Sequence, residues 1–302
     1  MKTFRGISFL LLICMIMALL LMLKEEKPQT PFSRSLAPLF QELGKPIESV
    51  DRAISRLFPV DEIDEKMLGE EIKLRFANST QPSNPADEAT VKYLNSLVEQ
   101  LSVETRRSFQ YQVFLIIGPP NAFAMPGGAL FITKGLMDTL DNEAELVAIL
   151  GHEMGHVERG HLFDAARGEM LRRKIPKISV VTYASDIIHL IAELSFDKTQ
   201  EDEADEYGFR MLLKKGYDPI AMSTSFEKFI QRSTQKQKST SPINDFFNSH
   251  PYTEHRFEKF RSRAILWKQN YPNEKRILGK ENFENRVTVF ETQFSESAEN
   301  HL

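Results

Sequence analysis

The feature that most constrains this chain is an H-E-x-x-H motif at residues 152–156, set inside an apolar stretch with helical periodicity. Residues four apart lie on one face of a helix, one turn above each other. His152 and His156 can therefore direct their imidazoles at one metal ion, and Glu153 lies close enough on the helix to reach a water bound to that ion. Zinc is the expected ion, because it accepts imidazole nitrogen readily and keeps a fourth position open for water in catalytic sites.

The residues around the motif support a metal-binding helix. On a helical wheel, large apolar side chains lie opposite His152 and small residues lie beside the two histidines. The large residues are Leu146, Leu150, Met154 and Val157, and the small ones are Ala148 and Gly155. This pattern predicts an apolar stripe on the core and room for an ion and a substrate beside the histidines. The alternative is a helix whose histidines are only hydrogen-bonded.

A third ligand must come from further along the chain. Arg159 and Leu162 occupy the positions at which metzincins carry a glycine and a third histidine. Pro176 occupies the position at which thermolysin-like enzymes carry a glutamate ligand. The acidic segment 200–208 is the best remaining candidate region.

The helical period separates two glutamates in this segment. Glu201 and Glu203 point in nearly opposite directions on a helix, so at most one of them faces the metal. Glu201 shares its face with small or short residues that permit close approach of another helix, namely Ala204, Asp205 and Gly208. Glu203 shares its face with residues typical of a solvent-facing surface, namely Glu206, Tyr207 and Arg210. Glu201 is therefore the expected third ligand, with Asp205 as a supporting or acid group; the alternative is an ordinary acidic helix surface.

A series of motifs in fixed order extends this pattern over residues 61–267, most of the chain. The motifs are N-A-F-A-M-P-G-G at 121–128, Gly135-Leu136, H-E-M-G-H with His161 beyond it, Glu201-x-x-x-Asp205, G-Y-D-P at 216–219 and His250-Pro251. The series resembles the gluzincin metallopeptidases that include the HtpX membrane protease, the Ste-type CAAX prenyl protease, the Oma-type mitochondrial protease and, most similar, the periplasmic BepA-like branch. One departure is Tyr252, which stands where a second proline is common in that family.

The resemblance implies roles for individual residues. His152, His156 and Glu201 match the ligands of one zinc ion per chain, Glu153 matches the catalytic base, and Asp205 matches the family's proposed proton donor. It also implies a substrate cleft lined by the segment Asn121, Ala122, Phe123 and Ala124. The substrates implied are polypeptides.

The expected fold is α+β and mainly helical, a gluzincin zinc-protease domain at residues 61–270. Amphipathic patterns predict helices at 62–76 and 88–102, and the chain after residue 143 is expected to be helical. Residues 271–302 are expected to form a C-terminal extension that is partly disordered.

A small sheet is expected beside the motif helix. Branched and aromatic residues at 111–117 predict a strand, and 121–125 and 129–133 predict short edge strands around the Pro126-Gly127-Gly128 turn. An exposed edge near a metal suits binding of an extended peptide by strand addition. The alternative is a plain turn between strands.

The N-terminus predicts a membrane anchor. Lys2 and Arg5 precede an uncharged run at 7–23, whose length is near the lower limit of about 17–25 residues for a membrane span. We expect residues 1–23 to be an uncleaved signal-anchor, residues 24–60 a juxtamembrane stem, and the catalytic domain to lie outside the cytoplasm, on the periplasmic side of a bacterial membrane. The alternative is secretion to the periplasm after signal cleavage. The apolar run 178–194 contains Asp186, which favours a buried or cleft-covering helix over a second span.

Composition excludes other classes of protein. The net charge of −4 provides no basic face for nucleic acid. The one cysteine, Cys14, lies in the predicted anchor, so the domain has no internal disulfide.

The sequence thus predicts a zinc metalloendopeptidase, and the resemblance to the periplasmic relatives implies that its substrates are misfolded or stalled envelope proteins, which would give it a role in quality control. The alternative is a chaperone-like binding protein with low or regulated proteolysis. His250 has two possible functions near a zinc site, as hydrogen-bond donor to an oxyanion or as a ligand that fills the fourth position until substrate displaces it. A structural histidine bonded to backbone at a helix start is the third possibility.

Overall fold

The computed structural model describes residues 60–80, 82–174, 196–235, 250 and 253–294, all within one compact unit of residues 57–302. The predicted anchor 1–23, the stem up to residue 59 and the apolar run 178–194 lie outside the described residues. Within the described part of the chain, no helix has both the length and the apolar character needed to cross a membrane.

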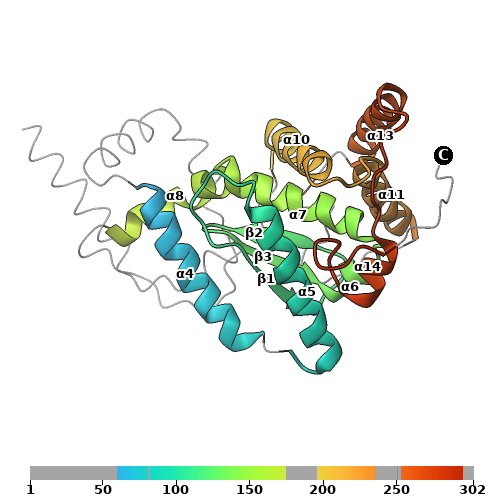
Figure 1. Ribbon diagram of the computed structural model, residues 1–302. Coiled ribbons are helices and arrows are strands. Elements are labelled where there is room, and N and C mark those ends of the chain that lie inside the picture. Colours follow the sequence, from blue (N-terminus) through green and yellow to red (C-terminus); the bar gives the residue numbers. More distant parts are fainter. Residues whose placement is uncertain (1–59, 81, 175–195, 236–249, 251–252, 295–302) are drawn as a thin grey trace, which may run out of the picture. The chain divides into compact units, whose positions relative to one another are not determined.

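The described chain is mainly helical with one small sheet, which confirms the α+β expectation (Figure 1). The strands are β1 (Gln112–Ile116), β2 (Ala122–Met125) and β3 (Ala129–Thr133). The helices are α4 (Glu62–Ser79), α5 (Pro85–Ser102), α6 (Lys134–Met137), α7 (Glu143–Glu158), α8 (His161–Lys174), α10 (Lys198–Lys214), α11 (Ile220–Gln235), α13 (Thr253–Asn270) and α14 (Lys280–Asn285).

Local capping explains where the first helices begin. The Asp61 carboxylate accepts hydrogen bonds from the first turn of α4, whose end at Ser79 lies beyond the predicted one. Asn84 caps α5 by accepting a hydrogen bond from the Asp87 N–H, and Pro85 occupies the first helical position. The start of α5 therefore precedes the predicted start at residue 88.

The sheet has the order β1-β3-β2, with β1 parallel and β2 antiparallel to β3. β3 is the central strand and is buried along its whole length, so the expectation that 129–133 would be an edge strand was wrong. β2 is an edge strand of the described sheet, but Ala122 and Ala124 are buried, so the expectation of an exposed edge was also wrong. The order of strands depends on which helices cover them, and no local pattern carries that information.

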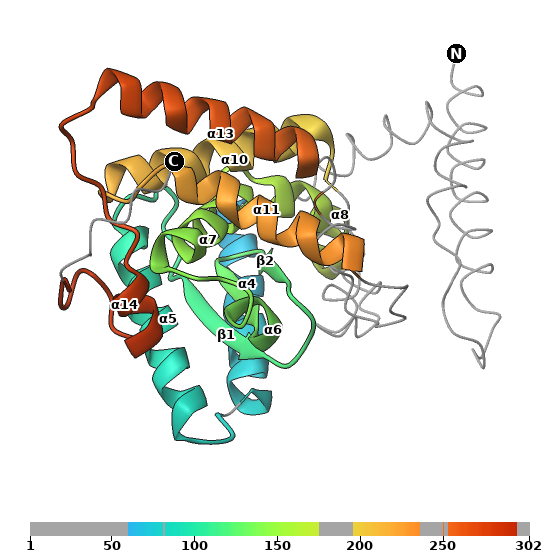
Figure 2. The same ribbon diagram turned by 90° about the vertical axis from the view of Figure 1, so that its right-hand side faces the viewer.

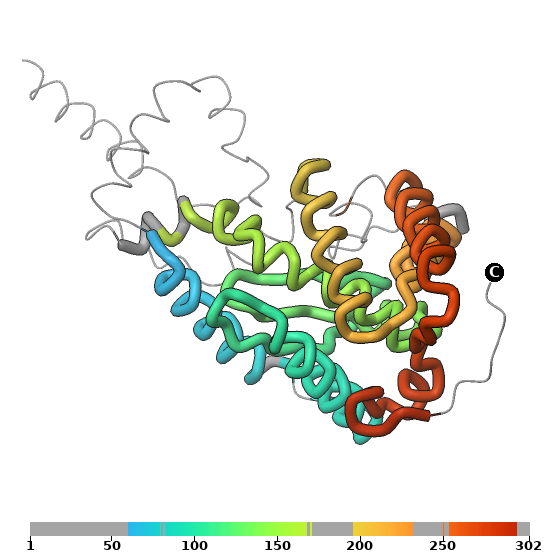
Figure 3. Tube along the Cα trace, turned by 45° about the horizontal axis from the view of Figure 1, so that its top comes forward, coloured from blue at the N-terminus to red at the C-terminus, as the bar shows by residue number. Residues whose placement is uncertain are grey.

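The sheet lies between α4 and α7 (Figures 1 and 3). On the α4 side, Phe131 stacks on Phe123 with ring centroids 4.8 Å apart, and Phe76 of α4 meets the Phe131 ring edge-on at 4.5 Å. α7 packs against β2 and β3, and α10, α11 and α13 form a further helical layer beyond α7 (Figure 2). The motif helix is therefore enclosed between the sheet and this layer, and residues 143–157 are buried on all faces rather than along one stripe.

α7 and α10 approach each other through small residues. A Cβ on Gly151 would lie 2.9 Å from the Gly208 Cα, and a Cβ on Gly155 would lie 3.0 Å from the Ala204 Cα. Because the two backbones are this close, side chains of α10 can reach the histidines of α7.

The chain beyond residue 270 packs on the start of α7. The carbonyl oxygens of Leu278 and Gly279 accept hydrogen bonds from the first N–H groups of α7, which no intrahelical partner can satisfy. The Glu143 carboxylate accepts hydrogen bonds from Tyr217 Oη at 2.6 Å and the Val289 N–H at 3.0 Å. The described part of the predicted extension, 271–294, thus contributes contacts to the domain, while 295–302 lie outside the described residues.

Gly151→Ala is expected to destabilise the metal-free protein. Overpacking against the α10 backbone costs about 1–3 kcal/mol, which exceeds the gain in helix propensity of about 1 kcal/mol. Urea unfolding with a chelator present measures the free energy of unfolding. An unchanged or larger value would show that the helices separate without cost.

Candidate metal centre

Three separate parts of the fold supply the predicted site residues. α7 carries His152, Glu153 and His156, α10 carries Glu201, and His250 precedes α13. All five are at most 2% exposed. The structure therefore gathers groups that are up to 98 positions apart in the chain into one buried cluster.

The ligand atoms lie close enough together to share one metal ion. Nε2 of His152 lies 3.1 Å from Nε2 of His156 and 3.1 Å from Nδ1 of His250. Oε1 of Glu201 lies 3.4 Å from Nε2 of His156 and 2.9 Å from Nδ1 of His250. Zinc–nitrogen bonds of about 2.0–2.1 Å place neighbouring tetrahedral ligands about 3.3–3.4 Å apart. The donor set thus fits one small ion such as zinc, with the four ligand atoms all within 4.8 Å of one another.

His250 occupies the corner that a catalytic zinc site leaves to water. Its Nδ1 faces the ligand atoms, while its Nε2 lies 3.4 Å from Oε1 of Glu153. The side chain therefore takes part in the cluster. The alternative of a helix-start histidine bonded only to backbone does not describe this position.

Glu153 lies beside the fourth corner and not among the ligands. Its Oε1 is buried and accepts no hydrogen bond within the described part of the chain. A carboxylate that is buried, next to the ligand set and free of a hydrogen bond at this oxygen is placed to accept a proton.

Asp205 lies behind His152. Its Oδ1 is 2.9 Å from Nδ1 of His152, the ring nitrogen that points away from the ligand cluster. The same carboxylate accepts hydrogen bonds from Arg256 at 2.8 and 2.6 Å and is 0% exposed. This position suits orientation of His152 and does not favour the proton-donor role that the resemblance implies.

Arg256 is the site residue that the sequence analysis missed. Its Nη1 makes an ion pair with Oε2 of Glu201 at 2.6 Å, without hydrogen-bond alignment, and its guanidinium lies 4.5 Å from the centroid of the Phe226 ring. Nη2 of Arg256 also lies 3.3 Å from Nδ1 of His152. A guanidinium can only donate hydrogen bonds, and an ionised carboxylate can only accept them. Because the contact of Nδ1 with Asp205 is the shorter one, we assign a proton to Nδ1, which donates it to Asp205. The signal that could have found it is the pair Glu201 and Asp205, since two acids buried one turn apart need a cation.

The cluster sets the protonation of its own members. Burial alone would raise the pKa of Asp205, but the charge of Arg256 and the hydrogen bond from His152 outweigh it and hold that pKa below its usual value. Burial likewise opposes ionisation of Glu201, yet the charge of His250 and hydrogen bonds from His156 and His250 hold its pKa well below normal. Burial lowers the pKa of His156 far below that of a free imidazole. Anionic carboxylates and neutral imidazoles are the forms that bind metal, so His250, which is charged beside Glu201 in the metal-free cluster, must release a proton when it binds an ion.

Further contacts surround His156. Its ring stacks on Phe196 with centroids 3.8 Å apart, and the same Phe196 ring lies 5.8 Å from that of His250. His161 places its Nδ1 2.9 Å from Nδ1 of His156. Glu203, expected to face solvent, has a side chain that is 47% exposed but binds Nε2 of His161 at 3.1 Å.

The predicted substrate segment lies on β2. Asn121 exchanges hydrogen bonds with Thr133, so the alternation of a strand turns the backbone groups of Asn121 and Phe123 toward β3 and those of Ala122 and Ala124 away from it. The outward groups of Ala122 and Ala124 are the ones that another strand would need. Both residues are buried in this structure, at 0% and 2% exposure.

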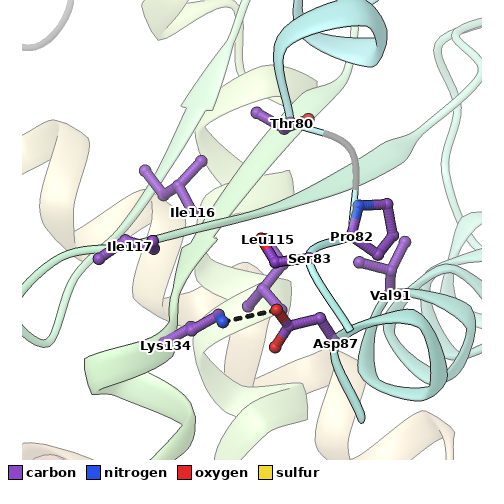
Figure 4. Close-up of a pocket in the computed structure, with 9 residues that line it drawn as sticks. All are labelled: Thr80, Pro82, Ser83, Asp87, Val91, Leu115, Ile116, Ile117 and Lys134. Carbon is purple, nitrogen blue, oxygen red and sulfur yellow. Dashed lines mark hydrogen bonds and ion pairs between the residues drawn. The ribbon is translucent and has the colours of Figure 1, made fainter. Parts of the chain in front are cut away.

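A separate pocket lies at the end of β1, between α4, α5 and the ion pair of Lys134 with Asp87 (Figure 4). None of the clustered histidines and carboxylates lines it. It is not part of the candidate metal centre.

Arg256→Met is expected to lower the free energy of unfolding of the metal-free protein by about 3–5 kcal/mol, because it leaves Asp205 buried without its cation and removes one of the two charged side chains that contact Glu201. The free energy of unfolding of Arg256→Lys should lie between those of Arg256→Met and the parent protein, since an ammonium keeps the charge but not the forked geometry. Urea unfolding with a chelator measures the effect. Arg210→Met is the matched control, because Arg210 pairs with Glu206 at the surface and should cost less than about 1 kcal/mol; equal losses in both variants would contradict the buried-pair argument.

Comparison with known proteins agrees with this geometry. The sequence profile described as Peptidase family M48 matches residues 88–264, more than half of the chain. Metalloprotease LoiP of Escherichia coli (strain K12) is 29% identical over 194 residues, which are 59% of this chain and 72% of that protein.

Two further relatives extend the comparison. The β-barrel assembly-enhancing protease of the same strain is 30% identical over 202 residues, 59% of this chain but 39% of that protein, so the chain matches less than half of it. Mitochondrial metalloendopeptidase OMA1 of Arabidopsis thaliana is 26% identical over 143 residues, 45% of this chain and 28% of that protein. The extent of the family match, together with the histidine and glutamate cluster that it contains, shows that the chain belongs to peptidase family M48, a family of metallopeptidases.

Proposed function

We propose that this metallopeptidase is a zinc-dependent endopeptidase that cleaves misfolded or stalled proteins of the cell envelope. The observation that carries the proposal is the convergence of His152, His156, Glu201 and His250, whose ligand atoms all lie within 4.8 Å of one another, with Glu153 beside them. Membership of a metallopeptidase family supports the reaction class.

The proposed roles follow the geometry. His152, His156 and Glu201 hold the ion, and zinc bound there would polarise the scissile carbonyl and lower the pKa of water toward about 7. Glu153 takes the proton of the attacking water and passes it to the leaving amine. Asp205 keeps His152 in the tautomer that presents Nε2 to the ion, so it acts by positioning and not by donating a proton.

His250 is proposed to be the ligand that fills the fourth position until substrate displaces it. Two contacts support this over the oxyanion-donor role: Nδ1 of His250 lies 3.1 Å from Nε2 of His152 and 2.9 Å from Oε1 of Glu201. The burial of every clustered side chain agrees with a closed, resting form. Opening requires His250 to leave the cluster.

The substrate is proposed to bind as an added strand on β2. The outward N–H and C=O groups of Ala122 and Ala124 supply the hydrogen bonds, as in other cases where an extended peptide joins a sheet edge. Asn121 and Phe123 hold the strand in register through their bonds to β3. Because β2 is buried here, the same opening that displaces His250 must uncover it.

The envelope role is proposed from the N-terminal sequence and from the relatives. Residues 1–23 have the length and flanking charges of a signal-anchor, and one relative is named for enhancing β-barrel assembly. We place the catalytic domain outside the cytoplasm and tethered to the membrane, with secretion after signal cleavage as the alternative.

A chaperone-like binding protein is the second candidate. The closed cluster supports it, because a site whose fourth position is already filled by His250 turns over slowly. The two functions differ in their dependence on metal and on Glu153.

Glu153→Gln is expected to abolish hydrolysis of unfolded casein while the protein still binds one equivalent of zinc, because the change removes the base and no ligand. A chelator should abolish hydrolysis by the parent protein, and added zinc should restore it. Peptide release and metal content by mass spectrometry are the measurements.

Glu201→Ala is the companion variant and should lose both zinc and hydrolysis. Near-normal turnover by Glu153→Gln would refute the role of the base. Client binding that persists without zinc, in a parent protein that never cleaves, would favour the chaperone-like function instead.

His250→Ala is expected to raise basal casein hydrolysis, with self-cleavage visible on gels, because it opens the fourth position. His255→Ala is the matched control, since His255 is exposed on the first turn of α13. A fall in turnover of about 10²–10³-fold would instead show that His250 donates to the oxyanion.

A further inference from the structure

His161 connects a metal-site histidine to a surface carboxylate. Its Nδ1 lies 2.9 Å from Nδ1 of His156, and its Nε2 lies 3.1 Å from Oε2 of Glu203. His161 is 5% exposed, whereas half of the Glu203 side chain faces solvent. The three residues therefore form a continuous chain from the ligand cluster to the surface of α10.

Only one arrangement of protons satisfies this chain when the imidazoles are neutral. An ionised carboxylate can only accept, so Nε2 of His161 must carry the proton that Glu203 receives. The Nδ1 of His161 then has a free lone pair and must accept from Nδ1–H of His156. The remaining nitrogen of His156, Nε2, is left without a proton.

We propose that His161 and Glu203 are positioning residues that fix the tautomer of His156 and so present its Nε2 to the metal. This inference deepens the proposed function and rests on it. A histidine ligand ordinarily donates its second ring N–H to a carboxylate or carbonyl, and here the carboxylate acts through an intervening imidazole.

We call the chain of His156, His161 and Glu203 the relay. With it, each of three carboxylates on α10 has a separate function in the proposed site. Asp205 accepts from Nδ1 of His152 directly at 2.9 Å, whereas Glu203 reaches His156 through His161. Glu201 on the same helix supplies the ligand oxygen itself. α10 therefore contributes one proposed ligand and one supporting carboxylate for each of the two histidine ligands on α7.

The backbone explains why His161 can reach His156 from only five residues away. Gly160 has φ of +77°, and its N–H bonds to the Val157 carbonyl oxygen, so α7 ends at this left-handed turn and α8 begins directly after it. His161 then becomes the first residue of α8 and lies against the last turn of α7. A non-glycine residue at 160 would be strained at this φ.

The test uses variants that separate the acceptor from the ring. His161→Phe keeps an aromatic ring but has no acceptor, and it is expected to weaken zinc binding by about 10–100-fold. His161→Asn places an amide oxygen where Nδ1 was, and it is expected to stay within a few-fold of the parent. Competition with a chromophoric chelator on the full-length protein measures the zinc dissociation constants, and circular dichroism checks folding.

A double-mutant comparison tests Glu203 as part of the same chain. Glu203→Ala should weaken zinc binding by about 10-fold in the parent and have no further effect when His161 is already Phe. Glu206→Ala is the matched control on the same helix, with a partly exposed acid that pairs with Arg263, and should change zinc binding in neither background. Positions 203 and 206 are at the surface. The comparison of the single variants Glu203→Ala and Glu206→Ala therefore still tests the proposal when His161→Phe fails to fold.

Nitrogen NMR of the histidine rings gives a readout that a purely structural role would not move. The relay predicts a proton on Nδ1 of His156 and on Nε2 of His161. The opposite pattern, or equal zinc affinity in the parent and in folded His161→Phe, or a loss in His161→Asn as large as in His161→Phe, would overturn the relay.

His156→Ala separates this inference from the proposed function. Loss of zinc in His156→Ala with unchanged affinity in His161→Phe would overturn the relay alone. Zinc retained at parent affinity by His156→Ala would overturn the proposed metal site and the relay with it.

Discussion

The close contact of α7 with α10 is the constraint on which the candidate site depends. Gly151 and Gly208 have no side chains, so the two backbones meet where larger residues would hold them apart. At that separation a short aspartate on α10 reaches the far nitrogen of His152, and Glu201 reaches the ligand nitrogens. The metal site is thus a property of helix packing as much as of the motif.

Buried charge is the second constraint, and α13 satisfies it. Two carboxylates removed from water would be costly without a cation, and Arg256 supplies one that contacts both. His250, three positions before α13, lies in the same cluster. His250 and Arg256 thus lie six positions apart in the chain, and both contact Glu201.

Local chemistry predicted most of the elements. Branched and aromatic residues marked β1, and the helical spacing of small residues in 200–208 placed Glu201 toward His152 and His156 and left Glu203 outside the ligand cluster. The same patterns failed for properties of the whole sheet. β3 is central and β2 is covered, because burial of a strand is decided by the helices that pack on it from elsewhere in the chain.

The sequence by itself predicted the ligand residues, set the helical spacing of His152 and His156, and indicated the family. These are local, since a helix of fixed pitch sets the directions of side chains four residues apart. The tertiary structure alone decided that Arg256 compensates the acids, that His250 joins the cluster of His152, His156 and Glu201, and that Glu203 contacts His156 through His161. Those contacts join segments far apart in the chain, and their distances follow from packing rather than from any spacing along it.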